Sequence, residues 1–154
     1  LHVIYKKLKN IKFNKLMYRS RSRFGSILVE SREVIMYLKN KLDKVKVLAV
    51  VADQSPRINS RKIWSKMLNQ ETAFLESIEF IPRFTDSHVY FASMKKTSRG
   101  RYEVNLEHIN DSKILKKNQI LERYISCMET QINENPGEWL WSHRRWKLTP
   151  ENNQ

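Results

Sequence analysis

The sequence predicts an α/β fold, and two observations carry this prediction. Residues 45–52 are almost continuously apolar and rich in β-branched side chains, as in a strand that is buried on both faces of a sheet. In residues 34–42 and 120–132, apolar side chains recur at intervals of three and four, as on the buried face of a helix. With 154 residues and 40% hydrophobic content, the chain has the size of one domain. We therefore expect a single α/β domain over residues 1–154.

The elements before the central strand are predicted as strand, helix and helix. Residues 1–5 are strand-like, and residues 8–18 place Leu8, Ile11, Lys15 and Tyr18 on one face of a short amphipathic helix. Ser31 is the expected cap of the next helix, in which Glu33 favours the first turn.

The segment from residue 59 to residue 84 is less regular. Its apolar spacing suggests two short helices, one around Trp64 and one around Phe80, and Pro82 weakens the second. Residues 88–94 and 102–108 are strand-like, and the Ser-Arg-Gly-Arg link between them predicts an antiparallel hairpin.

A long helix is predicted after Asn118, which can act as its cap, and it ends before Pro136. The tail that follows is aromatic and basic. Residues 149–154 are polar and are expected to form a disordered end.

The charge of the chain points to an anionic partner. Lys and Arg number 29 against 16 Asp and Glu, which gives a net charge of +13. Nucleic acid and an anionic membrane surface both fit this charge. The basic residues are spread along the sequence, so we assign the charge to the folded surface. No apolar run is long enough to span a bilayer, and the lone Cys127 allows no intrachain disulfide.

Asp53 and Gln54 are the strongest site candidates from residue patterns alone. They follow the central strand, and functional groups in open α/β sheets collect beyond the carboxyl ends of strands. The carboxylate of Asp53 can orient a catalytic or binding group, and Gln54 can donate to an oxyanion. The alternative, with equal weight, is an ordinary turn at a strand end.

Two basic segments are candidate anion sites. Arg19, Arg21 and Arg23 can hold a phosphate through paired hydrogen bonds, or they can form a solvated basic face. Arg144 and Arg145 lie among Trp139, Trp141 and Trp146, a composition that suits lipid headgroups or stacked bases. Core packing of the Trp residues with Arg stacking is the more common explanation of such a tail.

Several common chemistries lack their motifs. No His has a second His or a Cys at ligand spacing, so no metal site is expected. The chain also has no Gly-x-Ser-x-Gly elbow and no P-loop, and no cofactor is expected.

Taken in order, six segments resemble the lauroyl and myristoyl transferases that add secondary acyl chains during lipid A synthesis. The most distinctive is the closing Pro-Gly-Glu-Trp-Leu-Trp-Ser-His-Arg-Arg-Trp-Lys run, and Arg-Ser-Arg-Phe-Gly and Ala-Asp-Gln-Ser-Pro are moderately so. The matching segments are residues 4–8, 13–17, 21–25, 52–56, 69–74 and 136–147. Residues 75–84 depart from the family pattern, because Glu-Ser-Ile stands where the family carries a Gly.

The resemblance implies a glycerol-phosphate-acyltransferase-like mixed sheet flanked by helices, incomplete at the amino-terminal side. It also implies an acyl carrier protein thioester as donor, a phosphorylated glucosamine lipid as acceptor, and a location on the cytoplasmic face of the bacterial inner membrane. Carried over by position, Arg21 and Arg23 lie near a phosphate, Asp53 and Gln54 line the cleft, and Arg144 and Arg145 are further substrate contacts.

The family's catalytic motif, His-x-x-x-x-Asp or Glu, is missing here, since His2 is followed at that spacing by Lys7. We expect this dyad, and an apolar membrane anchor, upstream of Leu1, and we expect the present chain to lack acyltransferase activity by itself. Two alternatives stay open: a basic nucleic-acid-binding domain, which lacks a recognisable reader motif, and a non-catalytic piece that binds lipid or carrier protein.

Overall fold

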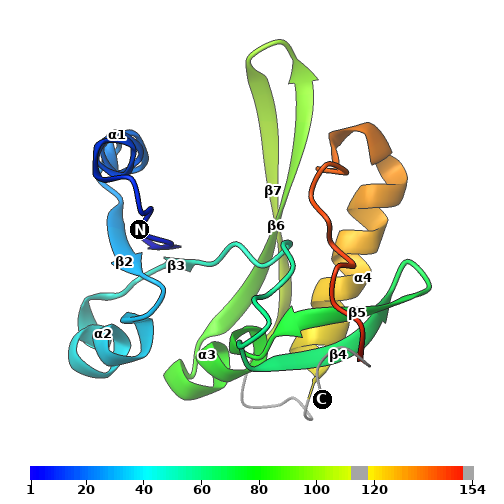
Figure 1. Cartoon of the computed structure of the whole chain (residues 1–154), viewed down its shortest axis with the longest axis horizontal. Coiled ribbons are helices and arrows are strands. Elements are labelled where there is room, and N and C mark those ends of the chain that lie inside the picture. The colour runs from blue at the N-terminus through cyan, green and yellow to red at the C-terminus, as the bar shows by residue number, and fades with distance from the viewer. Residues whose placement is uncertain (112–117, 151–154) are drawn as a thin grey trace. The chain divides into compact units, whose positions relative to one another are not determined.

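The computed structural model describes residues 1–111 and 118–150 (Figure 1). The chain forms two compact units, Leu1–Val51 and Ala52–Gln154, which we describe separately. The α/β class predicted from the sequence is confirmed, because both units combine helices with strands. The expectation that residues 1–154 form a single domain stays a prediction, and residues 151–154 of the expected disordered end lie outside the described part of the chain.

The first unit is a three-stranded parallel sheet with two helical crossovers. The strand order is β2-β1-β3, and both neighbours of β1 run parallel to it. The elements in chain order are β1 (His2–Tyr5), α1 (Ile11–Ser22), β2 (Ile27–Glu30), α2 (Val34–Lys41), the 3-10 turn η1 (Leu42–Lys44) and β3 (Leu48–Ala49). Its small core consists of Val29, Val34 and Leu38 with the buried His2.

The first predicted helix is present, but it begins at Ile11. Asn10 fixes this start, because its side-chain oxygen accepts the N–H of Phe13 at 3.0 Å. Arg19 and Arg21 lie in the last turn, where cations complement the helix dipole. No residue of α1 is buried.

The predicted cap of the second helix is wrong. The N-cap position of α2 is Glu33, with no side-chain capping bond, and Ser31 lies outside the helix. Val34 and Leu38 are buried as the spacing predicts, since they are one turn apart on the side that meets the core.

The prediction of a doubly buried strand over residues 45–52 is also wrong. Only Leu48 and Ala49 form a strand, and Val47, Val50 and Val51 are exposed. The physical reason is position: β3 is an edge strand that pairs with β1 alone, and only at His2 and Val3. The mean hydropathy of such a segment does not reveal how many neighbours the strand has.

The second unit begins with the antiparallel pair β4 (Lys62–Met67) and β5 (Gln70–Leu75). A helix was expected around Trp64, and this expectation is wrong. Leu68 and Asn69 both have positive φ, 50° and 61°, which closes a two-residue turn and sets the two strands side by side. Trp64 instead pairs with Ala73 across the ladder.

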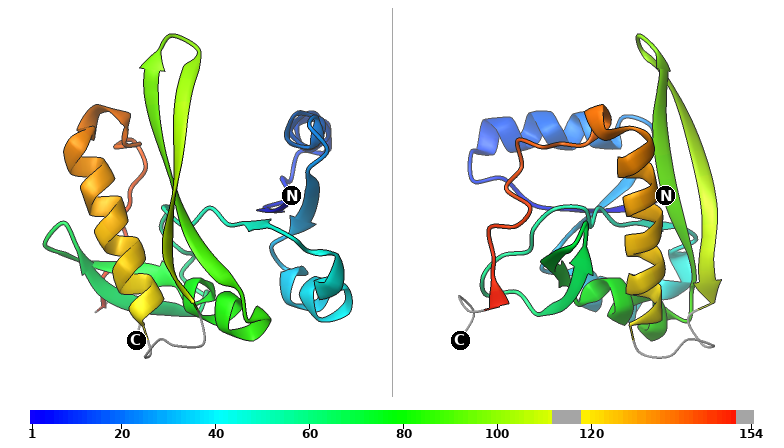
Figure 2. Two further views of the ribbon diagram at one scale, coloured as in Figure 1. Left: turned by 180° about the vertical axis from the view of Figure 1, so that it is seen from behind. Right: turned by 90° about the vertical axis from the view of Figure 1, so that its right-hand side faces the viewer.

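The second short helix and the hairpin after it are confirmed. Helix α3 (Ser77–Thr85) contains Pro82 and ends at Asp86, which has a left-handed conformation. The hairpin consists of β6 (His88–Ser98) and β7 (Arg101–Asp111), with Gly100 at a φ of 75° in its turn. Both strands are longer than predicted, and Figures 1 and 2 show the hairpin extending past the end of the neighbouring helix α4.

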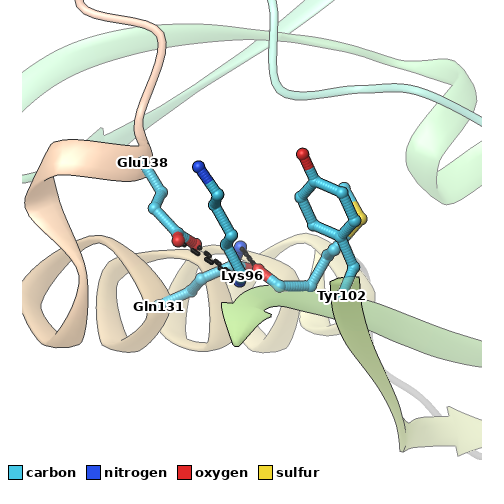
Figure 3. A pocket seen from close by; sticks show the side chains of 5 residues that line it. Lys96, Tyr102, Gln131 and Glu138 are labelled. Carbon is cyan, nitrogen blue, oxygen red and sulfur yellow. Dashed lines mark hydrogen bonds between the residues drawn. The ribbon is translucent and has the colours of Figure 1, made fainter. Parts of the chain in front are cut away.

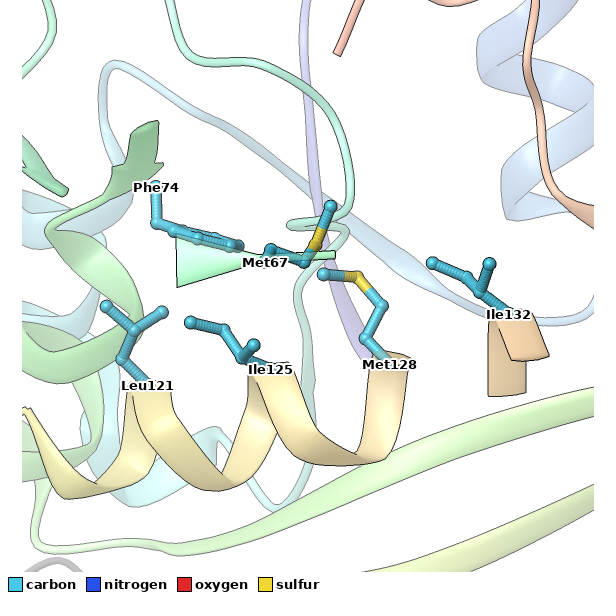
Figure 4. Packing of buried hydrophobic residues seen from close by; sticks show 6 residues of the cluster. All are labelled: Met67, Phe74, Leu121, Ile125, Met128 and Ile132. Atoms are coloured by element: carbon cyan, nitrogen blue, oxygen red, sulfur yellow. The ribbon is translucent and has the colours of Figure 1, made fainter. Parts of the chain in front are cut away.

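Helix α4 (Gln119–Glu134), followed by η2 (Pro136–Glu138), provides the main core of the second unit. The predicted stripe is confirmed: Leu121, Ile125, Met128 and Ile132 are buried against Met67 and Phe74 (Figure 4). Asn118 stands at the N-cap position, but its side chain makes no capping bond. Instead, the carboxylate of Glu79 in α3 accepts the N–H of Leu121 at 2.8 Å, because the two helices pack together.

Candidate functional site

The carboxy-terminal tail is anchored on β5 by Arg145 and Trp146. Arg145 is only 2% exposed, and its Nη1 donates to the carbonyl oxygen of Ala73 at 2.8 Å. Its guanidinium lies 4.6 Å from the ring centroid of Phe74. The indole N–H of Trp146 donates to the hydroxyl of Thr72 at 2.8 Å. These contacts match the alternative in which the Trp side chains of the tail pack in the core and an Arg stacks against an aromatic ring.

The turn after residue 52 is joined to the same tail. The backbone N–H of Ser55 donates to Nε2 of His143 at 2.9 Å, so this ring nitrogen acts as the acceptor. Pro56, next in the chain, is buried. The turn that carries Asp53 and Gln54 is therefore fixed to the segment that carries Arg144 and Arg145, across about ninety residues of sequence.

Asp53, Tyr124 and Arg145 form one electrostatic group. Burial lowers the pKa of Arg145, while Tyr124 and Asp53 act in the opposite direction. Burial also raises the pKa of Tyr124, and the carboxylate of Asp53 raises it further, against an opposing effect of Arg145. Tyr124 is therefore neutral at physiological pH, and its hydroxyl stays a hydrogen-bond donor.

Three polar atoms of this group are buried without a hydrogen-bond partner among the described residues: Oδ1 of Asp53, and Nε and Nη2 of Arg145. The first accepts and the other two donate. An uncompensated buried polar atom is unfavourable, so such atoms mark a place where water or a ligand is expected. Oδ1 of Asp53 needs a donor and the two nitrogens of Arg145 need acceptors, and a hydroxyl or an amide can supply either.

The predicted site residues are thus divided between the two units. In the second unit, Asp53 and Arg145 share a buried polar group, while Gln54 and Arg144 are exposed next to them in the chain. In the first unit, Arg21 lies in the last turn of α1 and Arg23 at its C-cap, both exposed, with Arg23 over the ring of Phe24 at 5.4 Å. The substrate contacts assigned to these six residues stay predictions.

Two residues around this turn and tail, Tyr124 and His143, were missed from the sequence. Tyr124 was predicted only as a member of the apolar stripe of the long helix. Its hydroxyl was the overlooked signal, because a hydroxyl within such a stripe needs a hydrogen-bond partner. His143 was grouped with the basic tail, and nothing local in the sequence indicates that it accepts a bond from Ser55.

A separate pocket of about 290 Å³ lies in the second unit, lined by Met94, Lys96, Tyr102, Gln131 and Glu138 (Figure 3). Gln131 donates to the carbonyl oxygen of Met94 at 3.3 Å, and both carboxylate oxygens of Glu138 accept the N–H of Lys96, at 3.2 and 3.4 Å. These side chains cover the open edge of β6. Protection of this strand edge therefore explains why the pocket is lined as it is.

Within the described residues, no three His, Cys, Asp or Glu side chains are grouped so that they could hold a metal ion. No described helix combines the length and the apolar character needed to cross a bilayer.

The geometry defines the class of this chain. It is an α/β protein in which an acidic turn is fixed to an aromatic, basic tail. Among protein families, residues 1–148 match the model of the bacterial lipid A biosynthesis acyltransferases. Since the match covers nearly the whole chain, the chain belongs to this family, whose activity is acyl transfer in lipid A synthesis. A search of curated proteins returns no match.

Proposed function

We propose that the chain is part of an enzyme that transfers a fatty acyl chain from an acyl carrier protein thioester to a hydroxyl of a lipid A precursor. The reaction takes place at the cytoplasmic face of the bacterial inner membrane. The observation that carries the proposal is the family match over residues 1–148. The buried polar group of Asp53 and Arg145 supports it, because it offers a matched acceptor and donors beside the exposed Gln54.

In this proposal the polar group positions a substrate hydroxyl or amide. Oδ1 of Asp53 accepts the substrate's proton donor, and the free N–H groups of Arg145 donate to its oxygen. Gln54 donates to the oxyanion that forms when the thioester carbonyl is attacked. Arg21, Arg23 and Arg144 are exposed cations for the phosphates of the acceptor.

The transfer itself requires a general base. The acceptor hydroxyl attacks the thioester carbonyl carbon, the carbon–sulfur bond breaks, and the carrier thiol leaves with the proton that the base has taken. None of the four His residues has Asp or Glu five positions later in the sequence. We therefore propose that residues 1–154 bind the substrates without turnover.

The test is a titration of the 154-residue chain with an acyl-loaded acyl carrier protein and with a phosphorylated glucosamine lipid. Chemical-shift mapping is expected to show changes at Gln54 and Arg144, and mass spectrometry is expected to show no acylated product. Unchanged spectra at high ligand concentration would overturn the binding assignment. Formation of product would overturn the proposal that these residues bind substrates without turnover.

A further inference from the structure

The segment from residue 6 to residue 24 carries only basic charges. It contains eight Lys or Arg residues and no Asp or Glu, and every one of the eight side chains is exposed. In the described part of the chain, no salt bridge neutralises any of them. The basic residues are Lys6, Lys7, Lys9, Lys12, Lys15, Arg19, Arg21 and Arg23. More than half of the net charge of +13 is therefore concentrated on α1 and its flanks.

Large apolar side chains stand among these cations. Ile11 is 83% exposed, Phe13 53%, Leu16 60% and Phe24 86%. A twelve-residue helix is marginally stable in water by itself, and packing of an apolar face normally supplies the missing stability. Because α1 has no buried residue, its apolar side chains are available to another surface.

One side of α1 carries both cations and an apolar side chain. Lys12, Leu16 and Arg19 are three and four residues apart, so they lie on a common helical face. The half-buried Asn14 and Met17 lie on the other side. Asn14 faces inward because its side-chain oxygen accepts the N–H of Leu8 at 2.9 Å. The outward face therefore mixes cations with an exposed Leu.

We propose that residues 6–24, with α1 at their centre, form the surface by which this chain docks on an anionic phospholipid bilayer. The cations lie among the headgroup phosphates, and Leu16, on the same helical face as Lys12 and Arg19, enters the boundary with the acyl chains. A nucleic acid offers the same negative charge, but an aliphatic side chain such as Leu16 gains little from stacked bases, whereas a bilayer accepts it. Charge and apolar exposure together favour the membrane.

This inference extends the proposed function, because it names the segment that meets the membrane at which the reaction occurs. Vesicle binding is measured without any acyl donor or acceptor. Its failure would leave the acyl-transfer proposal standing, and a failure of substrate binding would leave the docking surface standing.

The experiment is co-sedimentation of the 154-residue chain with vesicles of phosphatidylcholine alone and of an equimolar mixture with phosphatidylglycerol. The chain is expected to bind the anionic vesicles and not the neutral ones. Its affinity for the anionic vesicles should fall as the salt concentration rises. The triple variant K12E/K15E/R19E is expected to lose at least about tenfold in affinity.

A matched control reverses three exposed cations in the β6–β7 hairpin, K95E/R99E/R101E, so that the net charge changes equally. It is expected to bind within about twofold of the unchanged chain, since local and not total charge determines docking. The variant L16S keeps every charge and is expected to reduce the binding that persists at high salt. Circular dichroism checks that all variants stay folded.

Equal losses in the two charge-reversal variants would overturn the assignment to α1. Binding to duplex or single-stranded nucleic acid with no binding to anionic vesicles would overturn the choice of a membrane.

Discussion

At the scale of single residues, Arg145 joins the tail to the rest of the second unit. It supplies a hydrogen bond to Ala73, a cation over the ring of Phe74 and a counter-charge for Asp53. Arg144, its neighbour in sequence, is exposed. Substituting each of the two arginines in turn therefore separates the effect of a buried guanidinium from that of a surface charge.

We expect Arg145→Ala to lower the free energy of unfolding by about 3 kcal/mol, because it removes the hydrogen bond to the Ala73 carbonyl, the contact with the ring of Phe74 and the positive charge near Asp53. Arg144→Ala, the control, should change it by less than about 0.5 kcal/mol. Urea denaturation followed by fluorescence measures both. Equally small losses would show that the tail is not held by Arg145.

Cys127 allows a test by pH. Burial raises the pKa of its thiol, and the negative charge of Glu107 together with its hydrogen bond raises this pKa further. The thiolate is the reactive form, so alkylation by iodoacetamide should require a higher pH than alkylation of a free cysteine. Glu107→Gln should move the midpoint of the rate profile to lower pH. Glu103→Gln, an exposed change in the same strand, should leave it in place.

At the scale of elements, two connections determine how the second unit is assembled. One is the contact between Glu79 and the start of α4, and the other is the turn between β4 and β5. Neither can be read from the hydrophobic pattern, because both depend on a contact or a backbone angle that local sequence does not specify.

Glu79→Gln is expected to lower the free energy of unfolding by about 1 to 2 kcal/mol. The introduced amide can still accept the N–H of Leu121. The substitution, however, removes the negative charge from the start of α4 and the salt bridge to Arg83. Glu71→Gln, on the exposed side of β5, is the control and should have almost no effect. Thermal unfolding by circular dichroism compares them, and equal midpoints would contradict the capping role.

Asn69→Val tests the turn between β4 and β5. Asn69 has a φ of 61°, and a β-branched side chain in that conformation costs about 1 to 2 kcal/mol. Gln70→Val is a suitable comparison, because Gln70 is an exposed residue of β5 next to the turn and is not among the residues with positive φ. If chemical denaturation showed the same loss for both variants, the positive φ at Asn69 would not be the cause.

The elements that the sequence predicts correctly are those that local pattern determines. Helix α4 and the β6–β7 hairpin have long periodic segments bounded by strong turn signals. The region of β4 and β5 was misread, because Trp64, Met67 and Leu68 have a helical spacing by coincidence. The central strand was misread for a different reason: its apolar residues lie at a sheet edge, and edge position is a property of the whole sheet.

The site was predictable only in part. Asp53 was found because it follows an apolar segment, and the turn it belongs to is indeed fixed to the tail. Tyr124 and His143 were missed, because their roles arise from contacts between segments that are distant in sequence.

At the scale of the whole molecule, stability is expected to differ strongly along the chain. The buried face of α4 packs against both strands of the β4–β5 hairpin, whereas α1 contributes no buried residue. Regions with few buried apolar contacts open at low free energy. We expect the amides of α1 to exchange with solvent orders of magnitude faster than those at the centre of α4.

Hydrogen exchange with mass spectrometry measures this difference directly. Adding anionic vesicles should then slow exchange in residues 11–22 and leave α4 unchanged, because docking covers the exposed side of α1 and orders a helix that lacks packing partners. Neutral vesicles provide the comparison. Protection that rises evenly along the chain would mean general stabilisation rather than docking through α1, since a local contact protects only the amides whose opening it opposes.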